Sequence, residues 1–127
     1  MANALLLVED DKFVSTFVES VLEDGGYTVF VAEDGNHAIA RLEKNIDEIV
    51  GLVTDIRLGS DPDGWEVARR ARELKPTMAV VYMSGDSASD WAAQGVPKSV
   101  MLQKPFVEAQ LLTAISGLLI ENDSSLG

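Results

Sequence analysis

Apolar runs alternate with segments of helical periodicity along this chain. The run from Ile49 to Thr54 shows no polar alternation and ends on Asp55, which is typical of a strand buried on both faces of a sheet. Similar runs predict strands over 4–8, 27–32, 78–83 and 100–103. Apolar residues at spacings of three and four predict helices over 12–24, a short stretch ending near 44, 65–74, 87–94 and 107–120. This alternation favours a parallel sheet with helices on both faces.

The first predicted helix has clear start and stop signals. Asp10 or Asp11 can cap its N-terminus, and the pair Gly25-Gly26 can end it. Its apolar residues recur at helical spacing and are expected to share one face; they are Phe13, Val14, Phe17, Val18, Val21 and Leu22.

Turn signals separate the later elements. Gly59, Asp61-Pro62 and Asp63-Gly64 mark the loop from 56 to 63, and Lys75-Pro76 stops the helix that follows it. The stretch from about Glu121 is polar and is expected to be a frayed tail. Because no linker, low-complexity segment or repeat divides the chain, residues 1–127 are interpreted as a single domain.

Composition narrows the possible functions. The 127 residues are 46% hydrophobic and include no cysteine, which fits a globular fold and excludes a disulfide framework or a thiolate metal site. No apolar stretch reaches the roughly eighteen residues of a membrane-spanning helix, and the first residues lack the basic segment of a signal peptide, so a cytoplasmic location is expected. The formal net charge of -11 repels phosphate backbones and anionic lipids, which argues against direct binding of nucleic acid or membranes.

Polar side chains stand where the predicted strands end. Glu9 and Asp10 follow the first strand, Asp55 ends the third, Ser84 follows the fourth and Lys104 follows the fifth. In an open parallel sheet the ligand site lies beyond the carboxyl ends of the strands, so these side chains are expected to converge on one crevice. Asp55 alone is explained equally well as a turn residue. The other four residues favour Asp55 as the reacting group.

The chemistry of these side chains fits phosphoryl transfer. Two carboxylates about 5 Å apart repel by roughly 3 kcal/mol at an effective dielectric of about 20, so the acids need more compensation than Lys104 supplies. Magnesium binds one or two carboxylates together with water and phosphate oxygens. A carboxylate such as Asp55 can act as a nucleophile and form an aspartyl phosphate. Lys104, the metal and the Ser84 hydroxyl would then neutralise the phosphoryl oxygens.

These motifs resemble one known family. The combination of Leu7-Val8-Glu9-Asp10-Asp11, Asp55, Met83-Ser84-Gly85 and Lys104-Pro105-Phe106 resembles the receiver domain of two-component response regulators over essentially the whole chain. The resemblance implies a flavodoxin-like, doubly wound, five-stranded parallel sheet of order 2-1-3-4-5 with about five helices. It also implies phosphorylation of Asp55 by a histidine kinase or histidine phosphotransfer protein, and a cis peptide between Lys104 and Pro105.

The resemblance further implies a set of binding residues. Ser84 and Lys104 would contact the phosphoryl group, and Mg2+ would be held by Glu9, Asp10, Asp55 and the backbone carbonyl of Arg57. The protein would then be a signalling switch, not an enzyme, and with no output domain in this chain it would act by binding an unknown downstream protein, by relaying phosphate or by draining it from a kinase.

Some positions depart from the usual family pattern. Met101 stands where the family usually has an aromatic residue, which puts a two-position aromatic switch in doubt because a thioether adopts many rotamers. The loop after Asp55 is one residue longer than is usual in the family. Arg57 and Asp86 occupy positions that tune the phosphoryl lifetime in the family, and we predict that they form an ion pair that hinders attack by water.

Other notable residues are given structural roles. His37, the single histidine, is expected to be exposed, and Trp65 should pack its helix onto the sheet. Trp91 is interpreted first as a packing residue and second as an anchor for a partner. Asp61 and Asp63 are explained by turn chemistry.

Three other functions share parts of this pattern. A magnesium-dependent phosphatase with an aspartyl nucleophile would normally carry an Asp-x-Asp pair, whereas Asp55 is followed by Ile56-Arg57. A flavodoxin would place a phosphate-binding loop after the first strand, where this chain has acids. The third alternative is a protein-binding module that is never phosphorylated.

Overall fold

The computed structural model describes residues 4–126, with side chains placed for residues 4–121. The strands are β1 (Ala4–Val8), β2 (Thr28–Ala32), β3 (Ile49–Asp55), β4 (Ala79–Ser84) and β5 (Val100–Gln103). The α-helices are α1 (Lys12–Asp24), α2 (Gly35–Asn45), α3 (Gly64–Leu74), α4 (Trp91–Gln94) and α5 (Glu108–Leu126). One turn of 3-10 helix (Ala88–Asp90) precedes α4.

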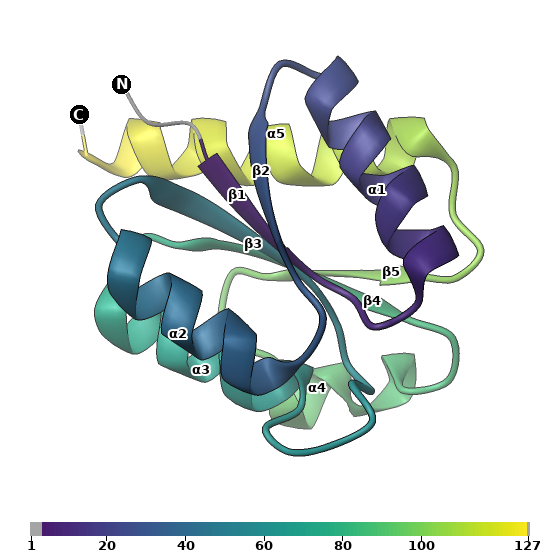
Figure 1. The fold of residues 1–127 in the computed structure, drawn as a ribbon. Coiled ribbons are helices and arrows are strands. Elements are labelled where there is room, and N and C mark those ends of the chain that lie inside the picture. Colours follow the sequence, from purple (N-terminus) through teal and green to yellow (C-terminus); the bar gives the residue numbers. More distant parts are fainter. Residues whose placement is uncertain (1–3, 127) are drawn as a thin grey trace.

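The strands form one parallel sheet in the order β2-β1-β3-β4-β5. Figure 1 shows α1 and α5 on one face of this sheet and α2 and α3 on the other. The sequence-based prediction of a flavodoxin-like, doubly wound sheet with about five helices is therefore confirmed. All the connections cross the sheet in the manner expected of parallel strands joined by helices.

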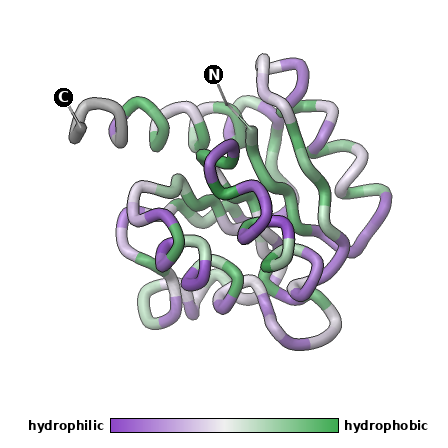
Figure 2. Tube along the Cα trace, turned by 60° about the vertical axis from the view of Figure 1, so that its left-hand side comes forward, coloured by the Kyte–Doolittle hydropathy of each residue, from purple (hydrophilic) through white to green (hydrophobic). Residues whose placement is uncertain are grey.

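Two apolar layers enclose the sheet because β1, β3 and β4 are buried on both faces. Leu6 and Val8 of β1 pack toward α2 and α3, whereas Leu5 and Leu7 pack toward α1 and α5. The strands carry the hydrophobic colour through the interior in Figure 2, and polar residues gather on the outer helical surfaces. The continuous apolar runs of the sequence thus reflect burial on both sides.

The first helix begins and ends as its capping residues indicate. Asp11 accepts hydrogen bonds from the backbone amides of Phe13 and Val14, at 2.9 and 3.2 Å. Gly25 caps the C-terminus, and Gly26 adopts φ 98°, a left-handed conformation that glycine tolerates without a Cβ clash. The capping residues therefore fix where α1 begins after β1 and where it ends.

Two predictions about the helices are corrected. The six apolar residues of α1 do not share one buried face: Phe13 is 90% exposed and Phe17 47% exposed, while Val18, Val21 and Leu22 are buried. Phe13 lies in the first turn at one margin of the apolar arc, where the periodicity does not reveal that the sheet has ended. The last helix does not end near residue 120 as predicted, because α5 continues to Leu126.

No helix among the described residues is long and apolar enough to cross a membrane.

Candidate functional site

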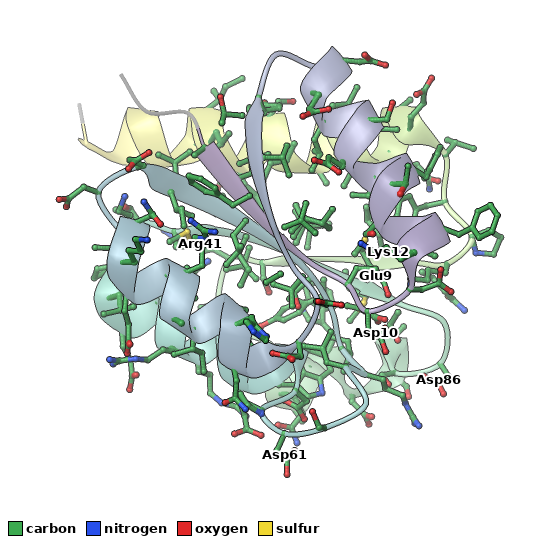
Figure 3. The ribbon with its side chains drawn as sticks, in the orientation of Figure 1. Glu9, Asp10, Lys12, Arg41, Asp61 and Asp86 are labelled. Atoms are coloured by element: carbon green, nitrogen blue, oxygen red, sulfur yellow. The ribbon has the colours of Figure 1, made fainter. Side chains whose placement is uncertain are left out.

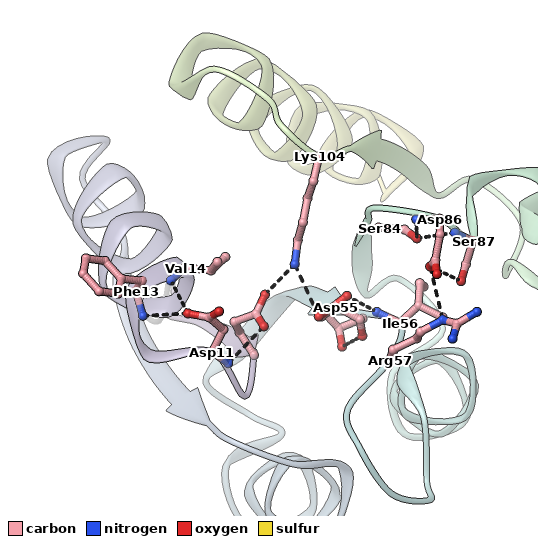
Figure 4. Close-up of polar contacts among 12 residues, drawn as sticks. Asp11, Phe13, Val14, Asp55, Ile56, Arg57, Ser84, Asp86, Ser87 and Lys104 are labelled. Atoms are coloured by element: carbon pink, nitrogen blue, oxygen red, sulfur yellow. Dashed lines mark hydrogen bonds and ion pairs between the residues drawn. The ribbon is translucent and has the colours of Figure 1, made fainter.

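Lys104 connects the ends of three strands. It follows β5, and its Nζ lies 3.0 Å from Glu9 Oε1, beyond β1, and 3.3 Å from Asp55 Oδ2, at the end of β3. Figure 4 shows the lysine side chain extended from the end of β5 toward these carboxylates. The Lys104–Pro105 peptide is cis, as the resemblance implies, and so is Asp61–Pro62, which sequence analysis did not anticipate.

The two carboxylates are fixed by backbone donors as well as by Lys104. Asp11 N donates to Glu9 Oε2 at 3.2 Å, and Ile56 N donates to Asp55 Oδ1 at 2.8 Å. The Glu9 side chain is 1% exposed, that of Asp55 13% and that of Lys104 26%. Asp55 is therefore held in place while remaining accessible from solvent, whereas Glu9 lies beneath it.

Burial and neighbouring charge perturb the ionisation of this group. Burial raises the pKa of Glu9 to about 7, and the negative charge of Asp55 adds to the rise, while the hydrogen bond from Lys104 opposes it. Burial alone would lower the pKa of Lys104, but Glu9 and Asp55 outweigh it and hold that pKa above its usual value. The lysine is therefore a cation at neutral pH, and Glu9 is poised to exchange a proton.

A metal ion fits the acidic side of this site. Glu9, Asp10 and Asp55 each offer a carboxylate oxygen, and these three oxygens lie within 4.8 Å of one another. Oxygen ligands of this kind are those that Mg2+ prefers, and the ion commonly keeps several of its waters. These acids form a pocket that can bind a divalent cation.

A close backbone contact positions the end of β3. A Cβ atom on Gly64, the first residue of α3, would collide with the Asp55 carbonyl oxygen. Gly64 N also donates to Ile56 O at 2.8 Å. Asp63 is the N-cap of α3, where its side chain accepts a hydrogen bond from Glu66 N at 3.0 Å. The loop from 56 to 63 is thereby anchored directly behind Asp55.

Ser84 stands beside this group at the end of β4. Its backbone carbonyl accepts a hydrogen bond from Lys104 N at 2.8 Å. Its buried hydroxyl oxygen accepts from Asp86 N at 3.2 Å and Ser87 N at 2.6 Å. Since both contacts use oxygen lone pairs, the hydroxyl proton is available for an incoming acceptor. Ser84 is thus joined to Lys104 through the backbone, while its side chain holds the loop after β4.

The predicted ion pair between Arg57 and Asp86 is present. Arg57 Nε lies 3.1 Å from Asp86 Oδ1 and links the loop after β3 to the loop after β4. Figure 4 shows the pair beside Asp55 and Ser84. Both side chains are well exposed, at 74% and 61%, so the pair bridges the mouth of the site, not its interior.

Comparison with known proteins identifies the family to which this chain belongs. Residues 5–116 match the family model described as the response regulator receiver domain. The chain is 33% identical over 118 residues to the response regulator receiver protein CpdR of Brucella abortus, covering 91% of this chain and 96% of that protein. The chain belongs to the response regulator receiver family.

Solved structures agree with this assignment to the receiver family. A response regulator receiver protein from Sinorhizobium medicae WSM419 is 46% identical, with a TM-score of 0.92 over 95% of this chain and 97% of that one. Longer relatives contain the receiver as one part. The chain covers 44% of the transcriptional regulatory protein TrcR of Mycobacterium tuberculosis, at 34% identity, and 13% of the sensor kinase CckA of Brucella abortus, at 32% identity.

The aromatic residues have roles that the sequence revealed only in part. Trp65 is buried against Tyr82, with ring centroids 4.7 Å apart, which confirms its predicted packing role. Trp91 is 38% exposed and its Nε1 donates to Ser99 Oγ at 2.9 Å. The His37 side chain is 73% exposed, as predicted.

Sequence analysis missed a contact of the receiver segment between β4 and β5. The Tyr82 hydroxyl accepts a hydrogen bond from Val96 N at 3.1 Å and so ties this segment to β4. The sequence signal for this contact is Tyr82, the one aromatic residue of β4. Met101 lies opposite Tyr82 in the register of β4 and β5.

Proposed function

We propose that this receiver domain accepts a phosphoryl group on Asp55 and thereby switches its interaction with a partner protein. The position of Lys104 carries the proposal: its Nζ lies 3.3 Å from Asp55 Oδ2 and is held there by buried Glu9. A fixed cation beside an accessible carboxylate neutralises charge where a phosphoryl group would be bound, and phosphoryl transfer depends mainly on such positioning and neutralisation.

The reaction is a nucleophilic substitution at phosphorus. An Asp55 carboxylate oxygen attacks, a new O–P bond forms, and the N–P bond of a phosphohistidine donor breaks with its electron pair returning to the imidazole ring. Lys104 Nζ and the Ser84 hydroxyl donate hydrogen bonds to the phosphoryl oxygens. Drawing the Ser84 hydroxyl toward the phosphate would weaken its contacts with the amides of Asp86 and Ser87, so the loop after β4 would respond.

Magnesium would be held by Glu9, Asp10 and Asp55, whose carboxylate oxygens lie within 4.8 Å, with the Arg57 carbonyl as the additional ligand that the family resemblance implies. When bound, the ion supplies positive charge to the phosphoryl oxygens. Arg57 and Asp86 bridge the mouth of the site, and we propose that they slow the approach of water to the acyl phosphate.

An apolar surface beside the site is suited to a phosphodonor protein. A groove of about 450 Å³ is lined by Phe13, Val14, Phe17, Lys104, Pro105 and Phe106. Phe13 is 90% exposed on the first turn of α1 and lines this groove together with Lys104. Exposed aromatic residues are favoured at protein interfaces. A histidine kinase or histidine phosphotransfer protein that docks there would bring its phosphohistidine to Asp55.

The proposal also covers whether this receiver acts alone and what its output is. We propose that residues 1–127 act as a stand-alone receiver, since CpdR, of which the chain covers 96%, is itself described as a receiver protein. Its output would be binding of a downstream protein or relay of the phosphoryl group, not turnover of a metabolite.

Incubation with acetyl phosphate, with and without magnesium, tests the proposal by intact mass. We expect a gain of one phosphoryl group that requires magnesium and is absent from Asp55→Asn, while Asp47→Asn, a matched change at an exposed acid, behaves as wild type. Absence of any gain in folded protein would favour a binding module that is never phosphorylated. Steady release of inorganic phosphate from a phosphomonoester would favour a phosphatase.

A further inference from the structure

The outer edge of β2 offers an open place for another strand. Of the strands that the structure describes, β2 pairs only with β1, and Figure 1 shows it at the front of the sheet. Glu9 N donates to Ala32 O at 3.1 Å, so the polar backbone groups of Ala32 face β1. Because these groups alternate along a strand, those of Val29 and Val31 face outward and can pair with an added strand.

A groove on the α2 side of this edge is lined by basic side chains. It has a volume of about 280 Å³ and is lined by Val31, Ala32, Glu33, His37, Ala40, Arg41 and Lys44. His37, Arg41 and Lys44 follow one another at helical spacings of four and three, so they share one face of α2. Arg41 Cζ lies 4.8 Å from the centroid of the Phe30 ring, so this side chain contacts the edge strand.

A second groove lies on the α1 side of the same edge. It measures about 190 Å³ and is lined by Glu9, Asp10, Lys12, Ser15, Val31 and Glu33. Glu9, Asp10 and Lys12 are labelled in Figure 3 on the opposite side of β2 from Arg41. Val31 and Glu33 belong to both grooves, and Val31 is 41% exposed between them.

Two grooves that flank one strand edge match the geometry of an added strand. Successive side chains of a strand point to opposite faces of the sheet, so they would enter the two grooves in turn while the backbone pairs with Val29 and Val31. The groove beside α2 gathers cations in a chain of net charge -11. This groove therefore favours an acidic side chain of the partner next to Arg41 and Lys44. Next to Glu33, at the other end of the groove, an acidic side chain is disfavoured.

We propose that the outer edge of β2 binds an extended acidic segment of a partner protein by strand addition. A second copy of this chain is a poor occupant, because β2 carries no carboxylate of its own that could meet Arg41 and Lys44. Asp55 lines neither groove, so Asp55→Asn protein should bind the segment as wild type does.

Short capped peptides test this proposal by backbone NMR and amide hydrogen exchange. The probe is Thr-Val-Glu-Val-Thr, with Thr-Val-Lys-Val-Thr as its charge-reversed control. We expect the acidic peptide to shift the amides of Val29 and Val31 and to slow their exchange. Lys44→Glu should weaken this binding at least about threefold, consistent with an exposed charge contact. Lys98→Glu makes the same charge change at an exposed lysine that lines neither groove, and this variant should bind as wild type does.

Several results would overturn the proposal. These are the absence of any shift at β2 with the acidic peptide, equal binding of the basic peptide, or equal weakening by both lysine variants. Protection of Val29 and Val31 that grows with protein concentration in the absence of peptide would instead identify a second copy as the occupant.

Discussion

Lys104 and Glu9 form a 3.0 Å ion pair across 95 residues of sequence, in which the carboxylate is almost fully buried. The pair places the lysine beside Asp55, at 3.3 Å. It leaves a site with three carboxylates and one cation, so the site is short of positive charge until a metal ion binds.

Magnesium affinity should depend on pH through Glu9. Because the pKa of Glu9 is raised to about 7, the folded protein holds a proton there that must leave before the carboxylate can bind metal. We expect the affinity for Mg2+ to rise as pH increases from about 6 to about 8, with proton release on binding. Calorimetry in two buffers of different ionisation enthalpy measures both quantities. A pH-independent affinity would contradict this assignment.

The same group should make stability depend on pH. The pKa of Glu9 is 4.5 in its ordinary state and about 7 in the fold, so its contribution is present below about 4.5 and is lost as pH rises through about 7. Without magnesium, the free energy of unfolding should fall over this range by at most about 4 kcal/mol, since one pKa unit corresponds to about 1.4 kcal/mol. Urea denaturation of wild type and Glu9→Gln measures it, and the variant should show a flatter profile.

Removal of the Lys104 charge should slow phosphorylation without lowering the affinity for magnesium. A charge-assisted hydrogen bond contributes about 1.5–3 kcal/mol, so Lys104→Gln should slow phosphorylation by acetyl phosphate about tenfold or more. Magnesium affinity should not fall, because the three carboxylates lose a competing cation. Lys98→Gln, a matched change at an exposed lysine, should match wild type in both assays. Unchanged phosphorylation of Lys104→Gln would remove the lysine from the proposed site.

The Arg57–Asp86 pair should affect lifetime more than stability. Both side chains are exposed, and such pairs contribute about 0.2–1 kcal/mol to folding. We expect Arg57→Ala to shorten the lifetime of the phosphoryl group several-fold, measured by intact mass over time, with a small change in the urea midpoint. Asp86→Asn should have a similar effect. If both variants lose phosphate at the wild-type rate, the pair has no shielding role.

Phe13 should matter for a protein donor and not for a small one. It is 90% exposed beside Lys104, so Phe13→Ala removes contact area without opening a core cavity. With a histidine phosphotransfer domain that phosphorylates the wild-type protein, we expect transfer to slow about tenfold or more, as for an interface hot spot of about 2 kcal/mol. The acetyl phosphate rate should not change. Ile120→Ala, at another exposed apolar residue, is the matched control, and equal slowing by both variants would count against docking at Phe13.

The order of elements and the clustering at the site were predictable from the sequence. An apolar run that ends on Asp55 identifies a buried strand, and the geometry of parallel strands brings Glu9 and Lys104 to the same edge. The ion pair of Arg57 and Asp86 followed from positions two residues beyond Asp55 and Ser84. These predictions depended on strand ends, which local patterns define well.

Features that depend on tertiary placement were not predictable. The periodicity of α1 gives a helical arc but not the point where the sheet stops, so the exposure of Phe13 was missed. The hydrogen bond from Val96 N to the Tyr82 hydroxyl joins residues that are separated by a loop whose course no local pattern defines. The two grooves beside β2 arise only when α1 and α2 are both placed against one strand edge.

Chemical trapping of the phosphorylated residue tests the central claim most directly. Borohydride reduces an acyl phosphate to an alcohol, so phosphorylated protein that is reduced, digested and sequenced by mass spectrometry reveals which acid carried the phosphoryl group. We predict homoserine at position 55 and unmodified Glu9 and Asp10. A reduced residue at Glu9 or Asp10, or phosphorylated protein that resists borohydride, would contradict the assignment of Asp55 as the phosphoacceptor.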